Sequence, residues 1–198
     1  MSDTFFATMW RMKYIERWAL MRSSRSESLS EHSLDVAMLA HALCILGNER
    51  LGKSLNAERA ALIALYHDTA EIITGDLPTP VKHGSPEMKA AYAETEKQAL
   101  SRLLQKLPAD LRPVYSRILD PDPAQEDPYL LRLVKAADKL SALIKCIEEE
   151  TSGNREFHTA MCTTQRAVDQ LSAQLPEVAI FVREFLPHYG STLDELLM

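Results

Sequence analysis

The stretch His67-Asp68-Thr69-Ala70-Glu71 places one imidazole and two reactive carboxylates within five residues. It lies inside an apolar run, residues 57–74, whose spacing predicts a helix that packs into a core. Burying an unpaired polar group costs on the order of 2–7 kcal/mol, and an ion costs more, unless a partner compensates it. A bound metal ion is such a partner, because it turns an imidazole and a carboxylate into ligands. The stretch therefore predicts a metal site.

Two positions elsewhere in the chain carry the same kinds of ligand. His32 lies in the first turn of a predicted helix, and Asp138 follows two alanines inside another apolar helical run. With His67 and Asp68 they make a mixed set suited to a borderline divalent ion such as Mn²⁺, Co²⁺, Fe²⁺ or Zn²⁺. Four protein ligands on an octahedral ion leave two positions for water and a substrate oxygen, and a bound ion can lower the pKa of water to about 7. The set predicts hydrolytic metal chemistry.

Glu71 is the candidate for proton transfer at this site. It lies four residues after His67, so a continuous helix would place both side chains on one face. There Glu71 could accept or relay the proton of an attacking water. Two alternatives stay open: Glu71 could be a structural partner for a lysine, and Asp138 could pair with a neighbouring lysine on the surface.

The spacing of these residues resembles a known family signature. His32, then His67-Asp68, then Asp138 resembles the H…HD…D signature of the HD-domain metal phosphohydrolases. Three further motifs make the resemblance more specific: Arg17-Trp18, Ser30-Glu31-His32-Ser33, and Thr74-Gly75-Asp76-Leu77-Pro78-Thr79-Pro80. The combination is similar to the bacterial HD-domain 5′-deoxynucleotidases, which remove the 5′-phosphate from deoxyribonucleoside monophosphates. The C-terminal third of the chain carries no matching motif.

The resemblance implies the metal ligands and the catalytic residues. The implied ligands are His32, His67, Asp68 and Asp138, holding one divalent ion such as Co²⁺, Mn²⁺ or a similar transition metal. Glu71 would act on the attacking water. Arg17 would grip the phosphate, which suits a planar guanidinium that presents paired donors to phosphate oxygens.

The resemblance also implies how the nucleotide binds. Trp18 would lie against the nucleotide, and Asp76 would accept a hydrogen bond from the 3′-hydroxyl of the sugar. Pro78 and Pro80 would stiffen a pocket with no room for a 2′-hydroxyl; because rejection by shape alone is worth about 1–3 kcal/mol, good discrimination needs a rigid pocket. The implied substrate-binding positions are Arg17, Trp18, His32, Asp76, Leu77, Pro78, Thr79 and Asp138.

Three other functions stay open at this point. Another phosphohydrolase of the same fold would cleave a cyclic nucleotide or guanosine tetraphosphate, but residues 76–80 and Arg17-Trp18 fit a small monophosphate better. A non-catalytic helical interaction module could keep the ligands for stability. A ferritin-like di-iron bundle would need two Glu-x-x-His pairs, and the sequence contains none.

Composition indicates a soluble globular protein. The 198 residues carry a net charge of −6, which gives no electrostatic reason to bind polymeric nucleic acid or an anionic membrane. We expect no signal peptide and no membrane span. Cys44, Cys146 and Cys162 show no CxxC spacing, as expected of reduced thiols in a cytoplasmic protein. The family resemblance implies a homodimer. It also implies a small-molecule nucleotide as the substrate.

Helical periodicity recurs over nearly the whole chain, and strand alternation is hard to find. The predicted fold class is therefore all-α, a single domain over residues 1–198 forming an irregular helical bundle, which the resemblance places in the HD-domain type. The predicted helices span residues 5–18, 29–46, 57–74, 85–107, 109–119, 129–150, 155–175 and 178–186.

Start and stop signals set the limits of several predicted helices. Residues 28–31 have capping-box spacing, Asn56 is a helix cap, and Gly47-Asn48 ends the helix between them. Pro78 and Pro80 exclude a helix after Gly75.

Overall fold

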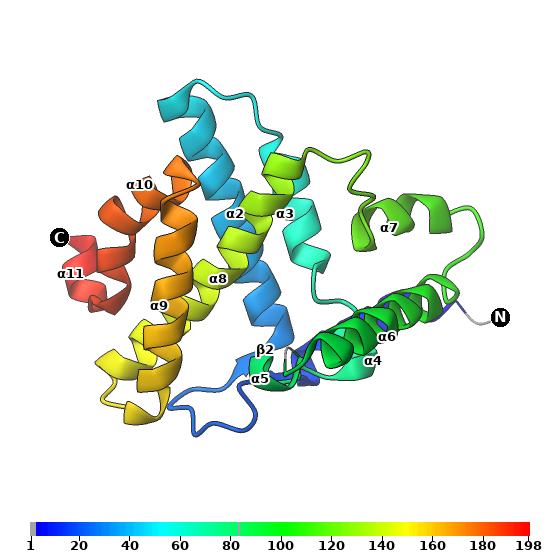
Figure 1. The fold of residues 1–198 in the computed structure, drawn as a ribbon, viewed down its shortest axis with the longest axis horizontal. Helices are drawn as coiled ribbons and strands as arrows, with labels where there is room; N and C mark the ends of the chain where they lie inside the picture. The colour runs from blue at the N-terminus through cyan, green and yellow to red at the C-terminus, as the bar shows by residue number, and fades with distance from the viewer. Residues whose placement is uncertain (1–2, 83) are drawn as a thin grey trace.

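The chain folds into a helical bundle with one short two-stranded ladder (Figure 1). The structure, a computed structural model, describes residues 3–82 and 84–198, with the backbone alone at residues 79 and 80. The elements, with 3₁₀ helices marked η, are α1 (Phe5–Met9), η1 (Trp10–Tyr14), β1 (Glu16–Arg17), β2 (Glu27–Ser28), α2 (Leu29–Leu51), α3 (Ala57–Tyr66), α4 (Glu71–Thr74), α5 (Thr79–Lys82), α6 (Pro86–Leu104), α7 (Arg112–Leu119), α8 (Pro128–Thr151), η2 (Arg155–Phe157), α9 (His158–Ser172), α10 (Pro176–Glu184), η3 (Leu186–Gly190) and α11 (Leu193–Leu197).

The main core lies where α2, α3 and α8 pack together. Leu43 of α2 and both Leu133 and Leu140 of α8 have no exposed surface. On the C-terminal side, α9 packs against α8, and α10 packs against α9 and α2 (Figure 1). The predicted all-α fold class is confirmed.

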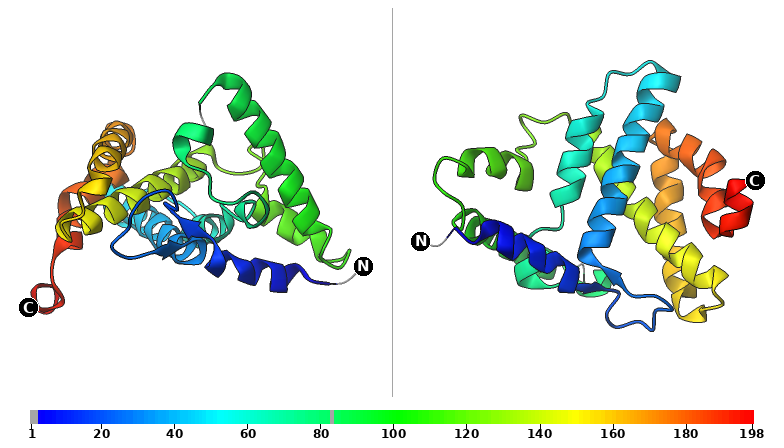
Figure 2. Two further views of the ribbon diagram at one scale, coloured as in Figure 1. Left: turned by 90° about the horizontal axis from the view of Figure 1, so that it is seen from below. Right: turned by 180° about the vertical axis from the view of Figure 1, so that it is seen from behind.

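A second, smaller core joins the N-terminus to the middle of the chain. Phe5 of α1 packs with Leu103 of α6, with Leu107 and with Leu119 of α7, and all four are buried. Helix α1 meets α6 near the C-terminal end of α6 and diverges from it beyond that point (Figure 2), and α4 and α5 also contact α6. This arrangement holds α4 and α5 beside the N-terminal segment that contains Arg17.

The predicted start of α2 is confirmed, and its predicted end is wrong. The Ser28 hydroxyl accepts from the Glu31 amide while the Glu31 carboxylate accepts from the Ser28 amide, as in a capping box. The helix continues through Gly47-Asn48 and ends at Gly52, which has a left-handed φ of 66°. A Cβ at Gly47 would lie 2.8 Å from a carboxylate oxygen of Glu177, so this glycine permits close packing and does not end the helix.

The predicted helix over residues 5–18 is also wrong beyond Tyr14. The chain leaves helical geometry at Ile15, and β1 pairs antiparallel with β2. The amide of Leu29 donates to the Ile15 carbonyl at 2.8 Å, which extends the pairing. Because this ladder satisfies backbone groups through a distant segment, tertiary pairing outweighs the weak local helix preference.

Two further limits differ from the prediction around the HD motif. The predicted helix 57–74 begins after its Asn56 cap but breaks into α3 and α4, with a turn at residues 67–70. A short helix, α5, follows where the prolines predicted none. Pro80 falls in the first turn of α5, where its missing N–H has no helical partner to lose. The remaining predicted helices match α6 to α10 within a few residues, whereas η3 and α11 were not predicted.

Within the described part of the chain, α2 is long and apolar enough to cross a membrane by length and composition. Half of its most apolar window is buried inside the protein, where it contacts α3 and α8. That burial is typical of a core helix.

Candidate metal centre

Four predicted ligands meet where α2, α8 and the turn after α3 come together. His32 lies in the first turn of α2, and Asp138 lies near the middle of α8. His67 and Asp68 lie in the turn that separates α3 from α4. The helix break thus lets two adjacent residues face the same point, which a continuous helix would direct about 100° apart.

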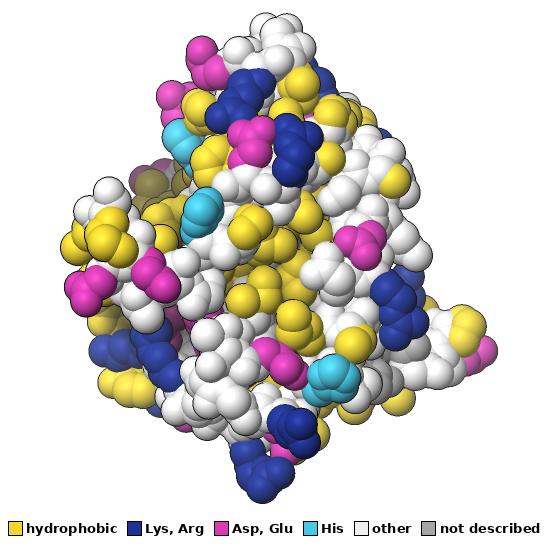
Figure 3. All heavy atoms as spheres, turned by 90° about the vertical axis from the view of Figure 1, so that its left-hand side faces the viewer, with side chains coloured by type: hydrophobic (Ala, Val, Ile, Leu, Met, Phe, Trp, Pro, Cys, Tyr) yellow, Lys and Arg dark blue, Asp and Glu magenta, His cyan; other side chains and the backbone are white. Residues whose placement is uncertain are grey.

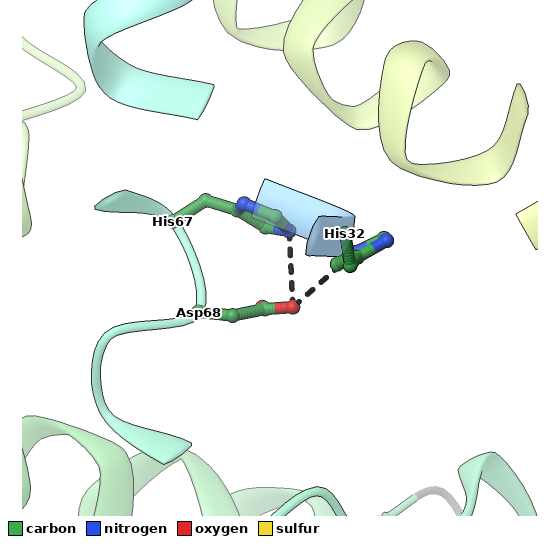
Figure 4. Close-up of side chains that lie close together, drawn as sticks. All are labelled: His32, His67 and Asp68. Carbon is green, nitrogen blue, oxygen red and sulfur yellow. Dashed lines mark ion pairs between the residues drawn. The ribbon is translucent and has the colours of Figure 1, made fainter. Parts of the chain in front are cut away.

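The donor atoms of His32, His67 and Asp68 converge (Figure 4). Oδ2 of Asp68 lies 3.1 Å from Nε2 of His67 and 3.5 Å from Nε2 of His32. Oδ1 of Asp138 lies 3.3 Å from Nε2 of His32 and 4.0 Å from Nε2 of His67. The structure therefore brings the two imidazole nitrogens and the Asp68 oxygen together, with the Asp138 oxygen beside the two histidines.

The histidine nitrogens show that this donor set fits a cation. Nε2 of His32 and Nε2 of His67 are both buried, and neither has a hydrogen-bond partner among the described residues. Nδ1 of His67 lies 2.7 Å from the Ala64 carbonyl, to which it can only donate, so the lone pair is on Nε2. Nδ1 of His32 lies 3.1 Å from the Ser141 hydroxyl. Buried polar atoms rarely stay unpartnered, and a metal ion would satisfy both nitrogens.

The electrostatics of the cluster also favour a positive charge. Burial disfavours a charged imidazole, but the nearby carboxylates of Asp138, Asp68 and Glu27 outweigh it and raise the pKa of His32 to about 10. Burial likewise opposes ionisation of Asp138, yet His32 and Lys139 hold the pKa of its carboxyl well below its usual range. A proton and a divalent ion compete for the same donor atoms. The negative carboxylates that favour a proton on His32 would therefore also favour a bound divalent ion.

Glu71 reaches the site by a different route from the one predicted. The helix break separates it from His67, so the predicted shared helical face is wrong. Glu71 begins α4 and is 1% exposed; Oε1 accepts from Lys82, and Oε2 has no hydrogen-bond partner among described residues. Burial and the charge of Asp68 raise the pKa of Glu71 to about 7, against the opposing effect of Lys82. A buried carboxyl that titrates near neutrality is suited to proton transfer.

Arg17, at the end of β1, approaches the same cluster, and Trp18 follows it in the turn after β1. Nη1 of Arg17 lies 3.5 Å from Oδ2 of Asp68, and its side chain is 10% exposed. The indole N–H of Trp18 donates to Oε2 of Glu27 at 2.9 Å, and the ring lies 5.3 Å from that of Phe157. A nearly buried guanidinium therefore stands at the edge of the four-residue donor set.

The predicted sugar-pocket residues follow α4. Oδ1 of Asp76 lies 3.7 Å from Nζ of Lys82, and the same lysine donates a hydrogen bond to Glu71. The Pro78 carbonyl accepts from the backbone of α5, and Leu77 is exposed. The side chain of Thr79 lies outside the described residues. The structure thus connects Asp76 to Glu71 through one lysine.

Comparison with known proteins extends over the whole chain. The family described as 5′-deoxynucleotidase YfbR-like matches residues 4–189. A 5′-deoxynucleotidase of Vibrio cholerae is 45% identical over 97% of this chain and 97% of that protein. One from Photorhabdus laumondii is 44% identical over 97% of this chain and 95% of that protein. The chain belongs to this 5′-deoxynucleotidase family. It is therefore an enzyme of the hydrolase class, and the predicted resemblance is confirmed.

Solved structures agree on the fold of the family. An HD-domain phosphohydrolase of Listeria innocua superimposes with a TM-score of 0.82 at 23% identity, covering 94% of this chain and 88% of that one. A cyanophage S-2L HD phosphohydrolase, bound to dA and one catalytic Zn²⁺, gives a TM-score of 0.55 at 22% identity, covering 86% and 93%. The predicted HD-domain type of helical bundle is confirmed.

Three residues at this centre were missed from the sequence. Ser141 follows Asp138 by three residues on α8, a helical spacing that could have suggested a shared face. Glu27 and Lys82 carried no usable signal. Glu27 comes from a two-residue strand, and Lys82 comes from a helix that the neighbouring prolines argued against.

Proposed function

We propose that this member of the 5′-deoxynucleotidase family hydrolyses deoxyribonucleoside 5′-monophosphates to deoxyribonucleosides and phosphate. The observation that carries the proposal is the convergence of two unpartnered histidine nitrogens with Asp68 and Asp138, beside the nearly buried guanidinium of Arg17. Such a set can hold a divalent ion and a phosphate at once, which is the requirement for hydrolysing a phosphomonoester.

In this proposal His32, His67, Asp68 and Asp138 hold one divalent ion, Co²⁺, Mn²⁺ or a similar transition metal. When bound, such an ion supplies charge neutralisation and lowers the pKa of water. The mixed nitrogen and oxygen ligands suit these borderline ions. His32 and Asp138 also border the space that the substrate would enter.

The remaining chemistry belongs to the side chains around the donor set. Arg17 binds the phosphate dianion with paired N–H donors, and its position beside Asp68 keeps the guanidinium at the edge of the site. Glu71 carries a proton at Oε2, the carboxylate atom that Lys82 leaves free. Its burial keeps bulk solvent from the carboxyl, so the proton passes between Glu71 and the attacking water or the 5′-oxygen that leaves phosphorus.

The nucleoside is held by residues on either side of the phosphate. Trp18 lies against the nucleotide, while Asp76 accepts from the 3′-hydroxyl of the sugar and Leu77, Pro78 and Thr79 shape the pocket. Lys82 supports this role, because it approaches both Asp76 and Glu71. The sugar-binding carboxylate and the proton-transfer carboxylate thus share one cation.

The test is phosphate release from matched ribo- and deoxyribonucleoside 5′- and 3′-monophosphates, a cyclic nucleotide and guanosine tetraphosphate, each with added Co²⁺. We expect deoxyribonucleoside 5′-monophosphates to be preferred with little regard for the base, and 3′-monophosphates to be ignored because Asp76 repels a 3′-phosphate. Asp76→Ala should weaken hydrolysis by the value of a charged hydrogen bond, about 1.5–3 kcal/mol. Equal rates on ribo- and deoxyribonucleotides would contradict the proposed sugar selectivity.

We also propose that two copies of the chain associate through a groove between α2, α8 and η3. The groove has a volume of about 400 Å³ and is lined on α2 by Leu34 and Met38, which are 54% and 59% exposed, and on η3 by Tyr189. Beyond η3, α11 exposes Leu193 and Leu197. Hydrophobic side chains also gather in the middle of the face that carries α9 to α11 (Figure 3). Exposed apolar surface rimmed by polar side chains, as this groove has, is typical of an interaction site.

Sedimentation equilibrium measures this association directly. The wild type should have twice the chain mass of 22.3 kDa, and Met38→Glu should shift it to the monomer because a charge would be buried in the interface. Ser101→Glu, on exposed surface of α6 outside the proposed association surface, is the matched control. A monomeric wild type at micromolar concentration would contradict the proposal. A cytoplasmic location and the lack of membrane or polymeric nucleic-acid partners stay predictions.

A further inference from the structure

We infer that Glu27 is a positioning residue whose single carboxylate holds Arg17, Trp18 and His32 in one arrangement. The contacts of Glu27 with these three residues are observed in the structure. Their consequence for nucleotide hydrolysis rests on the proposed function. Arg17 and Trp18 are the proposed phosphate and nucleotide contacts, and His32 is a proposed metal ligand. Glu27 would therefore couple substrate binding to the metal centre.

The β1–β2 ladder places Glu27 beside Arg17. The antiparallel register pairs Arg17 directly with Glu27, and paired residues on neighbouring strands lie side by side. Nε of Arg17 lies 3.7 Å from Oε2 of Glu27, and the two side chains are 10% and 11% exposed. The pairing orients the guanidinium so that Nη1 reaches Asp68. The local sequence did not predict this ladder. Its effect is to place the guanidinium of Arg17 between Glu27 and Asp68.

The same carboxylate oxygen fixes Trp18. Trp18 has a φ of 58°, and among the described residues it is the non-glycine residue with a positive φ. A left-handed conformation costs an ordinary residue about 1–2 kcal/mol, so it persists where other contacts impose it. The indole N–H donates to Oε2 of Glu27 at 2.9 Å, and Phe157 packs near the ring. Glu27 therefore holds Trp18 at the start of the turn that follows Arg17.

The other carboxylate oxygen faces the metal centre. Oε1 of Glu27 lies 3.6 Å from Nδ1 of His32, on the side of the ring away from Asp68 and Asp138. Ser141 lies against the same nitrogen. A carboxylate beyond a metal-binding imidazole orients the ring and directs its other nitrogen at the ion. Oε2 of Glu27 thus lies near the proposed substrate contacts Arg17 and Trp18, and Oε1 lies near the proposed metal ligand His32.

The test compares Glu27→Ala and Glu27→Gln with wild type and with Glu16→Gln, an exposed glutamate on the same strand as Arg17. Three quantities are measured: Co²⁺ affinity by titrating the absorption of the bound ion, Trp18 fluorescence in a Trp10→Phe background, and KM and kcat for a deoxyribonucleoside 5′-monophosphate. The first two do not depend on turnover. They therefore report on Glu27 even if the proposed substrate is wrong.

We expect Glu27→Ala to weaken Co²⁺ binding by about 10–100-fold and to raise KM by about tenfold or more, the usual effect of removing a group that orients metal ligands. Trp18 emission should shift to longer wavelength as the indole loses its partner. Glu27→Gln keeps an oxygen for the indole but loses the charge, so it should restore the Trp18 emission and leave KM raised. The Glu16→Gln variant should match wild type in all three measurements.

A result in which both Glu27 variants keep Co²⁺ affinity, Trp18 emission and KM within twofold of wild type would overturn the inference. A lower melting temperature with those three values unchanged would also overturn it, because it would make Glu27 a purely structural residue. If Glu27→Ala fails to fold, Glu27→Gln decides, since it preserves size and the indole hydrogen bond.

Discussion

Asp68→Ala is expected to lose the metal ion and to lower kcat by at least about 10³-fold. Among the residues that the structure describes, Asp68 is the one whose carboxylate approaches His32, His67 and Arg17 together. Without it the site keeps two imidazoles, which carry no negative charge, and the single carboxylate of Asp138, which is too little negative charge to hold a divalent ion tightly. A bound ion contributes several kcal/mol of charge stabilisation to phosphoryl transfer, and about 4 kcal/mol corresponds to 10³ in rate.

The measurement is metal content of the purified protein, together with phosphate release before and after chelation. Wild type should carry one ion per chain, lose activity on chelation and regain it with Co²⁺ or Mn²⁺. Asp110→Ala, which removes an exposed aspartate far from the donor set in sequence, is the matched control and should behave as wild type. Full activity in the chelated wild type would show that the central proposal is wrong.

Glu71→Gln is expected to keep the metal ion and the nucleotide but to lower kcat on the order of 10²–10⁴-fold, the usual loss when a general acid or base is removed. The amide keeps the size of the side chain and an oxygen for Lys82, but it cannot exchange a proton. Because the proposed metal set does not include Glu71, metal content should stay at the wild-type value. An empty metal site in this variant would make Glu71 a ligand or a structural group.

Lys82→Met separates proton transfer from structural pairing. It removes the lysine partner and leaves the carboxyl of Glu71 in place. If Glu71 acts chemically, Lys82→Met should lower kcat far less than Glu71→Gln does. Equal losses of kcat in the two variants, with equal losses of melting temperature, would instead assign Glu71 the structural role that the sequence left open.

The composition of the proposed metal set was inferred from the sequence alone. His67 and Asp68 are adjacent in an apolar stretch, so their chemistry could be inferred without knowing their neighbours, although both side chains are only partly buried. His32 and Asp138 lie on long helices whose periodicity is plain, and α2 and α8 form close to where it predicts. Residue type and helical periodicity are local properties, so both can be read from the sequence without knowledge of tertiary contacts.

Tertiary contacts decided how those residues are presented. The helix predicted through His67 and Glu71 breaks between them, which lets His67 and Asp68 face one point and leaves Glu71 to pair with Lys82. Helix propensities differ by less than about 1 kcal/mol per residue, so buried contacts override them easily.

The residues that the sequence did not reveal are those defined only by contact with a distant segment. Ser141 meets His32 across 109 positions of the chain, and Glu27 meets Arg17 only because β1 and β2 pair. Neither contact leaves a periodic pattern in the sequence. A two-residue strand is too short to show the alternation of apolar and polar residues that predicts a strand. Sequence by itself therefore determined which chemistry this protein carries, and the packing of α2, α8 and the β1–β2 ladder determined which side chains hold that chemistry in place.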